Sequence, residues 1–594
     1  MSKYASPLST RQMASISCLC CSLLMWAGCA SQKAEAPATE AESNAEITNN
    51  QEAGVDEGGI VKNIGDHLVV LRQGRLFAVN VAMEGQARQT GSIRVARDEA
   101  LNKNVWYDEM LVRGRDIYVI GFRYATLVED ESRSPANSYN YGVGATEISH
   151  FTLGEKGELT RAETLFLESA DYYDSSNYAS RMIDGQLVFY IPYASGGWHR
   201  EAYRGPYPSL LDYMGDGRFR RGEPILTGAD IQRPPKAGQN VLHTVVVCEV
   251  EDNQPRSCTA KAVAGGWWRT RYITSEDVFL WGEDRVWKFS LRDGSIKQHA
   301  AYGYPRDQFA FKLERREEDA SDKLHVLVQN HRTNKRSLDL LSLSVDAFDE
   351  SGEQELDARN SRVVMRELSN KWLAKVRFTG DWVLFSYTGY NHRATELGVH
   401  HIEKQRTYIH ELPNGHVTRL EPMYGVGALV SQTRYEQRSW WGRRSMKMSM
   451  HVLSLEGEEP VITDALELDG AAEAEARSHA FFFKPNKEDG GGVFGLPVTG
   501  ASGRGWWGQS VANIAFFDVS AKGTLALQGA VSASDAAKGT CETSCIDWYG
   551  NTRPIFLRDR IFALMGSELA EVALGARTKD DEGGVKVVQR VVMD

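Results

Sequence analysis

DVFLWGEDRVWKFSL, residues 277–291, predicts two short strands joined by a tight turn. The same pattern of strand, turn and strand occurs in His67–Val81 and, with a longer intervening loop, in Gly492–Val519. It recurs at intervals of roughly 40–60 residues with no helical pattern between the copies, as is typical of β-propeller blades with four strands each. A radial array of blades also explains how a long chain of short strands avoids extended exposed edges.

The chain contains several candidate groups of strands. They lie at residues 58–96, 104–168, 178–264, 269–302, 308–367, 373–422, 424–468, 475–533 and 553–592. The group at 424–468 is irregular, and strands shared between the last group and the first would close the ring. We therefore predict an all-β propeller of eight four-stranded blades, within a range of seven to nine.

The first 28 residues have the pattern of a lipoprotein signal peptide. Lys3 and Arg11 precede an apolar stretch, Met13–Trp26, that is shorter than the roughly 20 residues of a spanning helix. Ala27-Gly28-Cys29 then resembles the bacterial lipobox, whose cysteine receives the lipid, although Trp26 stands where Leu is usual. The alternative is an ordinary secretory signal in which Cys29 is incidental.

The remaining chain divides into a tether and a folded domain. Residues 29–50 are rich in Ala, Glu, Ser, Thr and Asn, which predicts a flexible tether, and residues 51–594 form the propeller. The net charge of -11 argues against nucleic acid as a partner, because phosphate binding needs clustered Lys and Arg. We expect an exported monomer, lipid-anchored through Cys29 to the outer membrane of a bacterial cell envelope, with an envelope protein or glycan as its partner.

Four cysteines follow the leader and Cys29. They are Cys248, Cys258, Cys541 and Cys545. An even number of cysteines in an exported protein predicts two disulfides, and sequence proximity favours Cys248–Cys258 and Cys541–Cys545. A zinc site is the weaker alternative, because neither pair has the C-x-x-C spacing.

Asn50–Lys62, NQEAGVDEGGIVK, resembles the opening signature of a secreted bacterial β-propeller domain family distantly related to WD40 repeats. Further matches follow in chain order at Ser180–Ile183, Gln308–Phe311, Val376–Asp381 and His479–Phe483. The resemblance extends from about residue 50 to about 575 and departs at Gly59, where the family usually carries Asp before the Ile. It implies the propeller fold and export, and it implies no established activity.

The sequence contains no familiar catalytic motif. None of the 14 histidines forms an H-E-x-x-H pair, and there is no G-K-[ST] phosphate loop. Gly508–Ala512 lacks the final glycine of a nucleophile elbow, and Asp346–Gly352 lacks the alternation of a calcium loop. We expect His400, His401 and His410 to lie on solvated strand faces. No catalytic residue, metal or cofactor is therefore predicted.

Five loops rich in tryptophan are the candidate ligand-binding loops. Their residues are Trp198, Trp267, Trp268, Trp440, Trp441, Arg443, Arg444, Arg504, Trp506, Trp507, Trp548 and Tyr549. We name the strands of a blade A to D in chain order, so that the B–C and D–A connections emerge on one face, and all five loops are assigned to such connections. Sugar rings or peptide side chains can cover an exposed tryptophan, and arginine adds donors for carboxylates or phosphates. Alternatively, the tryptophans pack against one another and close the top of the ring.

These features favour a non-enzymatic envelope module that binds protein or glycan at its tryptophan-bearing face. The alternative is a hydrolase or lyase working in the central cleft of the propeller. That function would require carboxylates, histidines or a metal to converge on one face of the ring. The sequence does not show that strand-end carboxylates such as Asp108, Asp184 and Asp381 do so. A structural stalk or surface-layer component is a third possibility.

Overall fold

A computed structural model gives the fold of residues 47–594. Outside the description lie residues 1–46, 104, 129–142, 171–178, 195–206, 234–240, 252–253, 267–269, 317–320, 332–335, 367, 369–370, 390–394, 438–443, 487–489, 501–512, 535–551 and 576–583. The chain divides into Met1–Ala38 and Thr39–Asp594, and everything below concerns the second unit. No helix in the described part of the chain is long and apolar enough to cross a membrane.

The described strands form nine sheets, each built on four antiparallel strands that run outward from A to D. The first three sheets are β2 (Val61–Ile64), β3 (His67–Arg72), β4 (Arg75–Asn80) and β5 (Arg88–Arg94); β6 (Val105–Arg113), β7 (Asp116–Leu127), β8 (Val143–Leu153) and β9 (Leu159–Glu168); and β10 (Ser180–Ile183), β11 (Gln186–Ala194), β15 (Val241–Glu251) and β16 (Gln254–Gly265).

The next three sheets have the same plan. They are β17 (Thr270–Ile273), β18 (Asp277–Trp281), β19 (Arg285–Ser290) and β20 (Ile296–Ala300); β22 (Phe311–Glu314) with β21 (Tyr304–Pro305), β23 (Lys323–Asn330), β24 (Ser337–Ser344) and β25 (Ser361–Met365); and β26 (Lys371–Thr379), β27 (Trp382–Gly389), β28 (Thr395–His401) and β29 (Arg406–Leu412). Short 3-10 turns lie beside them at η3 (Gln308–Ala310), η4 (Val345–Ala347) and η5 (Ala358–Asn360).

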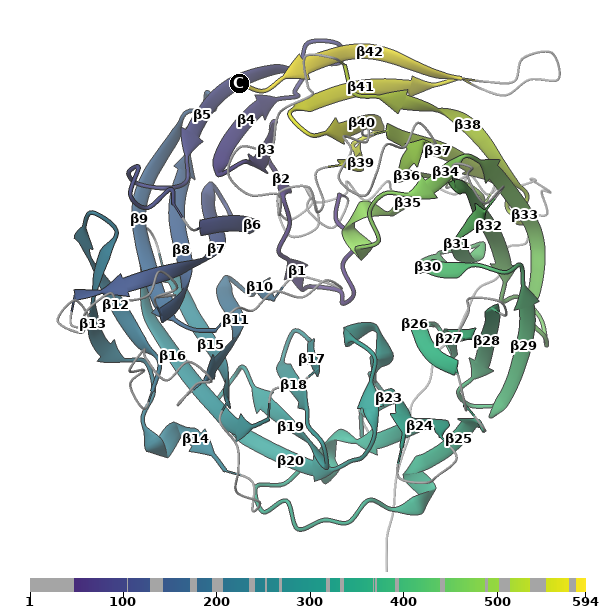
Figure 1. Ribbon diagram of the computed structural model, residues 1–594, viewed down its shortest axis with the longest axis horizontal. Coiled ribbons are helices and arrows are strands. Elements are labelled where there is room, and N and C mark those ends of the chain that lie inside the picture. Colours follow the sequence, from purple (N-terminus) through teal and green to yellow (C-terminus); the bar gives the residue numbers. More distant parts are fainter. Residues whose placement is uncertain are drawn as a thin grey trace, which may run out of the picture. The chain divides into compact units, whose positions relative to one another are not determined.

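The last three sheets complete the ring. They are β30 (His416–Met423), β31 (Gly427–Gln437), β32 (Arg444–Ser454) and β33 (Val461–Asp469); β35 (Phe482–Pro485) with β34 (Ala471–Glu473), β36 (Gly492–Gly500), β37 (Asn513–Val519) and β38 (Leu525–Ser532); and β39 (Thr552–Leu557), β40 (Arg560–Met565), β41 (Glu568–Leu574) and β42 (Val585–Val592). The 3-10 turn η6 (Ser478–Ala480) precedes β35. The sheets follow one another around a common axis, with the A strands innermost (Figure 1).

Burial explains why these runs form blades. The middle strands are apolar on both faces because each sheet packs between two neighbours, as Leu384 and Val399 of the sixth sheet do against Val417 and Val430 of the seventh. The outermost strands alternate instead, and β33 shows strict alternation of exposed and half-buried residues. The fold is thus an all-β propeller, as predicted from the period-2 runs.

The nine sheets differ from the eight blades predicted, although nine lies within the stated range. The irregular group at 424–468 is a complete sheet whose A strand, β30, begins at His416, inside the group assigned to the preceding blade. The last group shares no described strand with the first, because β39–β42 form four strands by themselves. The first and last sheets instead meet through side chains, and Gln589 binds both backbone groups of Ala87 at 2.7 and 2.6 Å.

Two insertions between β11 and β15 depart from the simple blade pattern. The hairpin of β12 (Ser209–Gly215) and β13 (Arg218–Pro224) extends the second sheet, and β14 (Ile231–Gln232) adds to the edge of β16. The 3-10 turn η2 (Gly228–Asp230) connects them. Within the third sheet, Cys248 and Cys258 are directly opposed on β15 and β16 and form the predicted disulfide. The predicted Cys541–Cys545 pair lies outside the described residues.

Candidate functional site

The residues before the first blade, Ile47–Gly59, form an axial segment that lies inside the ring of A strands (Figure 1). Only two of its residues form a strand, β1 (Asp56–Glu57), which pairs with Arg181 and Met182 of β10. The Gly58 N–H then donates to Ser180 O at 3.1 Å, and the Gly59 N–H donates to Met110 O at 3.1 Å. Backbone contacts with β10 and β6 therefore fix the end of the axial segment, from Asp56 to Gly59.

Two polar side chains of the axial segment reach the fifth, seventh and eighth sheets. Asn49 Nδ2 donates to Glu421 Oε2 of the seventh sheet at 3.1 Å and to Ser478 O, before the eighth, at 3.3 Å. Gln51 Nε2 donates to Gln308 O, beside the fifth sheet, at 3.0 Å. These contacts join the axial segment to blades that are far from it in the sequence.

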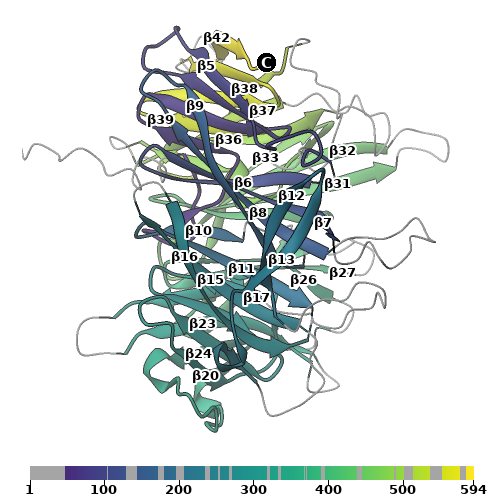
Figure 2. The ribbon, with the colours of Figure 1, turned by 90° about the vertical axis from the view of Figure 1, so that its left-hand side faces the viewer.

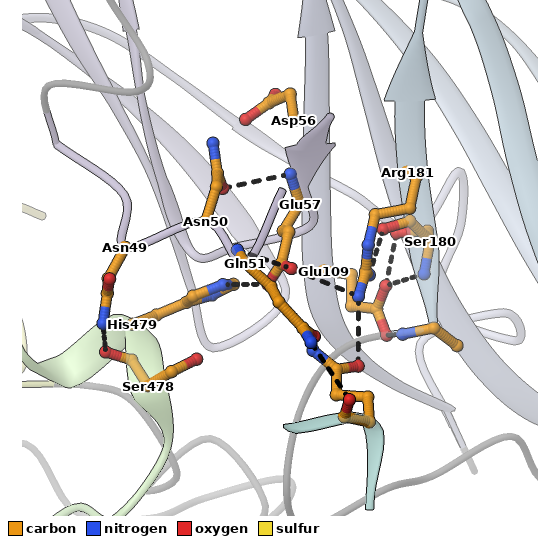
Figure 3. A network of polar contacts seen from close by, with 12 residues as sticks. Asn49, Asn50, Gln51, Asp56, Glu57, Glu109, Ser180, Arg181, Ser478 and His479 are labelled. Carbon is orange, nitrogen blue, oxygen red and sulfur yellow. Dashed lines mark hydrogen bonds and ion pairs between the residues drawn. The ribbon is translucent and has the colours of Figure 1, made fainter. Parts of the chain in front are cut away.

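Glu57 is the centre of the network shown in Figure 3. Its carboxylate accepts from His479 Nε2 at 2.7 Å and from the Gln51 N–H at 3.2 Å, and it lies 3.5 Å from Arg181 Nη2. Glu57, Arg181 and His479 are all buried. Burial lowers the pKa of His479 to about 4, so the imidazole is neutral near pH 7 and binds as an N–H donor.

Asp56 forms a second buried ion pair. Lys62 Nζ donates to Asp56 Oδ1 at 2.6 Å and to Glu57 O at 2.6 Å. Burial raises the pKa of Asp56 and lowers the pKa of Lys62, because each charge has lost its water. The close contact offsets that loss, so removing either partner would leave an uncompensated buried charge.

Similar buried charges lie on the innermost strands of other blades. Glu109 accepts from the N–H groups of Ala179 and Ser180 at 3.0 Å each. Arg419 pairs with Glu421 at 3.1 Å and with Glu473, and Arg377 pairs with Glu421 at 2.9 Å. Every carboxylate in this set has a nearby donor, so the polar axis is an internally paired network.

A small cavity remains beside the axial segment. Its volume is about 20 Å³, enough for about one water molecule. Its lining residues are Asp307, Phe309, Lys375, Val376, Arg377, Thr418, Arg419, Leu420, Glu421, Ala476 and Ser478. Burial lowers the pKa of Lys375 on this wall. A cavity of this size does not hold a substrate.

Nearly all the sequence-predicted site residues fall outside the described part of the chain. Those residues are Trp198, Trp267, Trp268, Trp440, Trp441, Arg443, Arg504, Trp506, Trp507, Trp548 and Tyr549. Arg444 is the exception, since it is the first residue of β32. Among the strand-end carboxylates, Asp108 lies within β6, and Asp184 and Asp381 are exposed in turns after β10 and β26.

The prediction for the histidines was wrong in part. His400 and His401 are buried between blades, because β28 packs on both faces, and His410 is half-buried. His400 Nδ1 lies 2.8 Å from the Thr407 hydroxyl, and burial lowers the pKa of His400 to about 4. Within the described residues no group of three or more His, Cys, Asp or Glu could hold a metal ion.

Sequence reasoning assigned no role to Glu57, Arg181 or His479, although each belongs to a quoted motif. The available signal was a charged residue inside a short apolar run, as in Ser180–Ile183. The structure also explains why position 58 is a glycine. A Cβ at this position would lie 2.7 Å from Ser180 Oγ and 2.8 Å from Glu109 Oε2, too close for any other residue without a shift.

The sheets and the axial segment define a β-propeller closed around its own N-terminal strand. The model of the family described as "Beta propeller domain" matches residues 46–351, and the chain belongs to this family. The match begins at the axial segment. No curated protein matches the chain.

Several solved structures are similar at low identity. A prolyl endopeptidase has 11% identity and a TM-score of 0.32 over 78% of this chain and 57% of its own. A post-proline cleaving enzyme from Rickettsia typhi has 9% and 0.28 over 78% and 60%, and Kluyveromyces lactis Hsv2 has 9% and 0.27 over 75% and 94%. This chain thus spans less than two thirds of either peptidase.

Proposed function

We propose that the protein is a lipid-anchored propeller of the bacterial cell envelope, on the outer membrane, and acts as a non-enzymatic scaffold that binds protein or glycan through its tryptophan-rich loops. The observation that carries this proposal is the place of those loops in the strand order. Residues 195–206, 438–443 and 501–512 follow a B strand, and residues 267–269 and 535–551 follow a D strand.

Antiparallel order makes this placement informative. Since A and C strands run one way and B and D strands the other, every B–C and D–A connection begins on the same face of the ring. Figure 2 shows the free ends of β7, β27, β31 and β32 toward one side. The five strands that precede tryptophan-rich segments therefore end on the same face of the ring, which favours a shared binding face.

The seventh blade supports the proposal with a projecting arm. The β31–β32 ladder continues through Tyr435↔Met446, Glu436↔Ser445 and Gln437↔Arg444. Pairing with β30 stops at Thr433, and pairing with β33 stops at Lys447. The two-stranded arm therefore extends past its own sheet, and residues 438–443, which include Trp440 and Trp441, connect its two strands in the sequence.

The filled axis favours binding over catalysis. A hydrolase or lyase working in a central cleft would need space where the axial segment lies, and the described cavity there has a volume of about 20 Å³. Arg377, Arg419 and Glu421 on its wall pair with one another. The net charge of -11 further favours a protein or glycan over a polyanion.

The binding face is tested by replacing Trp440 and Trp441 together with alanine and screening the full chain on glycan and peptide arrays. We expect hits that weaken by about 1–3 kcal/mol per buried anchor, with an unchanged melting temperature. Tyr424→Ala is the matched control, because Tyr424 is 77% exposed in an A–B connection on the opposite face. A lower melting temperature with unchanged binding would mean that the tryptophans are packing residues.

Lipid anchoring is tested separately by Cys29→Ser. We expect this variant to lose lipid labelling and to leave the membrane fraction, since one acyl-modified cysteine would be the attachment. Membrane retention equal to that of the unmodified chain would contradict the proposal.

A further inference from the structure

The β12–β13 hairpin is firmly seated on the second blade although it is inserted in the third. Arg221 pairs with the buried Glu168 of β9 at 3.0 Å, and the Tyr213 hydroxyl donates to Asp98 at 2.8 Å. The Phe219 ring packs edge-on against Phe166 with centroids 5.0 Å apart. This anchoring fixes the position of β12 relative to β9.

The two strands nevertheless separate after a single pair. Leu210 of β12 pairs with Leu167 of β9, and the antiparallel register would next bring Leu211 opposite Phe166, but no further pair forms. A groove of about 600 Å³ opens between the strands. Its lining residues are Arg97, Leu101, Arg161, Ala162, Glu163, Thr164, Leu165, Phe166, Leu210, Leu211, Asp212 and Tyr213. A volume of this size is typical of a ligand site.

The walls of the groove are suited to an extended chain. Apart from Leu167, no residue of β9 pairs on its outer side with a described strand, so this edge offers free N–H and C=O groups. Phe166, Leu211 and Leu101 are buried and make part of the lining apolar. A peptide strand can use both features, because its backbone binds the edge while its side chains enter the groove.

The charged residues of the lining indicate what charge a bound peptide would carry. Arg161 is half-buried and donates to Val95 O at 2.5 Å and Arg94 O at 2.6 Å, and Arg97 is exposed nearby. Within the described part of the chain neither guanidinium forms an ion pair. Of the two acids in the lining, Asp212 is already paired with Arg220 at 3.1 Å, and Glu163 is half-buried on the β9 wall. Burial, together with the charge of Arg97, lowers the pKa of Arg161, and an added carboxylate would relieve that repulsion.

We propose that the groove between β9 and β12 binds an extended acidic peptide segment of a partner protein. The segment adds a strand to the outer edge of β9, directs apolar side chains toward Phe166 and Leu211, and places a carboxylate beside Arg97 and Arg161. This site is independent of the tryptophan-rich loops, so the two proposals stand or fall separately.

The test measures fluorescence anisotropy of a labelled, acetylated peptide of alternating Val and Glu with the full chain. We expect saturable binding that Arg97→Glu weakens by roughly tenfold or more, since the variant puts a carboxylate where the peptide's carboxylate lies. Arg292→Glu is the matched control, because Arg292 is exposed on the fourth blade. A Val-Lys peptide should bind the unmodified chain poorly and the Arg97→Glu variant better.

Backbone N-methylation distinguishes strand addition from simple charge attraction. Two Val-Glu peptides, methylated on alternate amides of one edge or of the other, carry the same charge. Only the isomer that loses its donors to β9 should fail to bind. Equal binding by both isomers, or no binding of the Val-Glu peptide at millimolar concentration, would overturn the proposal.

Discussion

Glu57 shows how a single residue ties the blades together. Its carboxylate contacts His479 and Arg181, and its backbone pairs with β10. Glu57→Ala removes the acceptor of His479 Nε2 and the carboxylate beside Arg181, both of which are buried, so we expect the free energy of unfolding to fall by about 3–5 kcal/mol. Denaturant unfolding followed by tryptophan fluorescence measures the change.

The control for this variant is Glu99→Ala. Glu99 pairs with Arg94, but both side chains are more than half exposed, so water replaces the lost contact and little stability changes. Equal losses in the two variants would show that the axial network contributes no more than a surface ion pair does.

His479 links the same network to pH. In the unfolded chain a histidine gains its proton below about pH 6.5, whereas burial keeps His479 neutral in the fold down to about pH 4. The unfolded state therefore holds more protons between these values, and the stability contributed by His479 falls as pH drops from about 6.5 to 4.

We expect His479→Gln to flatten the pH dependence of stability in that window, because glutamine still donates a hydrogen bond but does not titrate. Melting temperatures of both proteins at half-unit pH steps measure the difference. If the melting temperatures of the two proteins changed with pH in parallel, His479 would not be the group responsible for the pH dependence.

Among the elements, the strands were predictable and the axial segment was not. Runs such as Asp277–Trp281 are apolar on both faces because they lie between blades, and that pattern is local. Ile47–Gly59 contains only a two-residue strand, and its partners Gln308, Glu421 and His479 are distant in the sequence. No periodicity in the sequence marks such long-range contacts. From the sequence alone, the buried charged residues on inner strands therefore cannot be told apart from residues that face solvent.

The predicted boundary between the sixth and seventh blades was wrong for a related reason. His416–Met423 follows β29 after a short Pro413–Gly415 connection, so the sequence alone joined β30 to the preceding blade. The β12–β13 hairpin was missed because its partners, β7 and β9, belong to another blade. The tryptophan-rich loops were found by composition, and their role remains a proposal.

The β15–β16 hairpin gives a prediction for one element. Its disulfide closes a loop with a sequence separation of 10, which predicts a contribution on the order of 2–3 kcal/mol. The Cys248→Ala, Cys258→Ala variant should still fold, because the cross-strand ladder from Val241↔Gly265 to Glu251↔Gln254 remains, but it should melt at a lower temperature. Reduction of the unmodified chain should lower the melting temperature at least as far, and reductant should affect the variant only through the predicted Cys541–Cys545 pair. Identical melting of oxidised and reduced protein would refute it.

At the scale of the whole ring, closure does not use a shared strand. The first sheet comes from one end of the described chain and the ninth from the other, and the two lie side by side in the ring (Figure 1). Side chains make the hydrogen bonds between them. Gln589 binds Ala87, Glu571 accepts from the Gly85 N–H at 3.0 Å, and Arg560 donates to Met83 O at 3.2 Å. The seam is thus a small set of hydrogen bonds beside an apolar cluster that joins the same two sheets.

Gln589→Ala tests whether this seam is where the ring opens. The change removes two hydrogen bonds and leaves both backbone groups of Ala87 without this partner, so we expect a loss of about 1–3 kcal/mol. Since opening at the seam frees the outer strands first, amide exchange should accelerate in β5 and β42 and stay unchanged in β31. Lys586→Ala, on the exposed side of β42, is the control and should leave exchange as it is. Uniform acceleration in all nine sheets would mean that the ring unfolds as one unit and that the seam is not its weakest point.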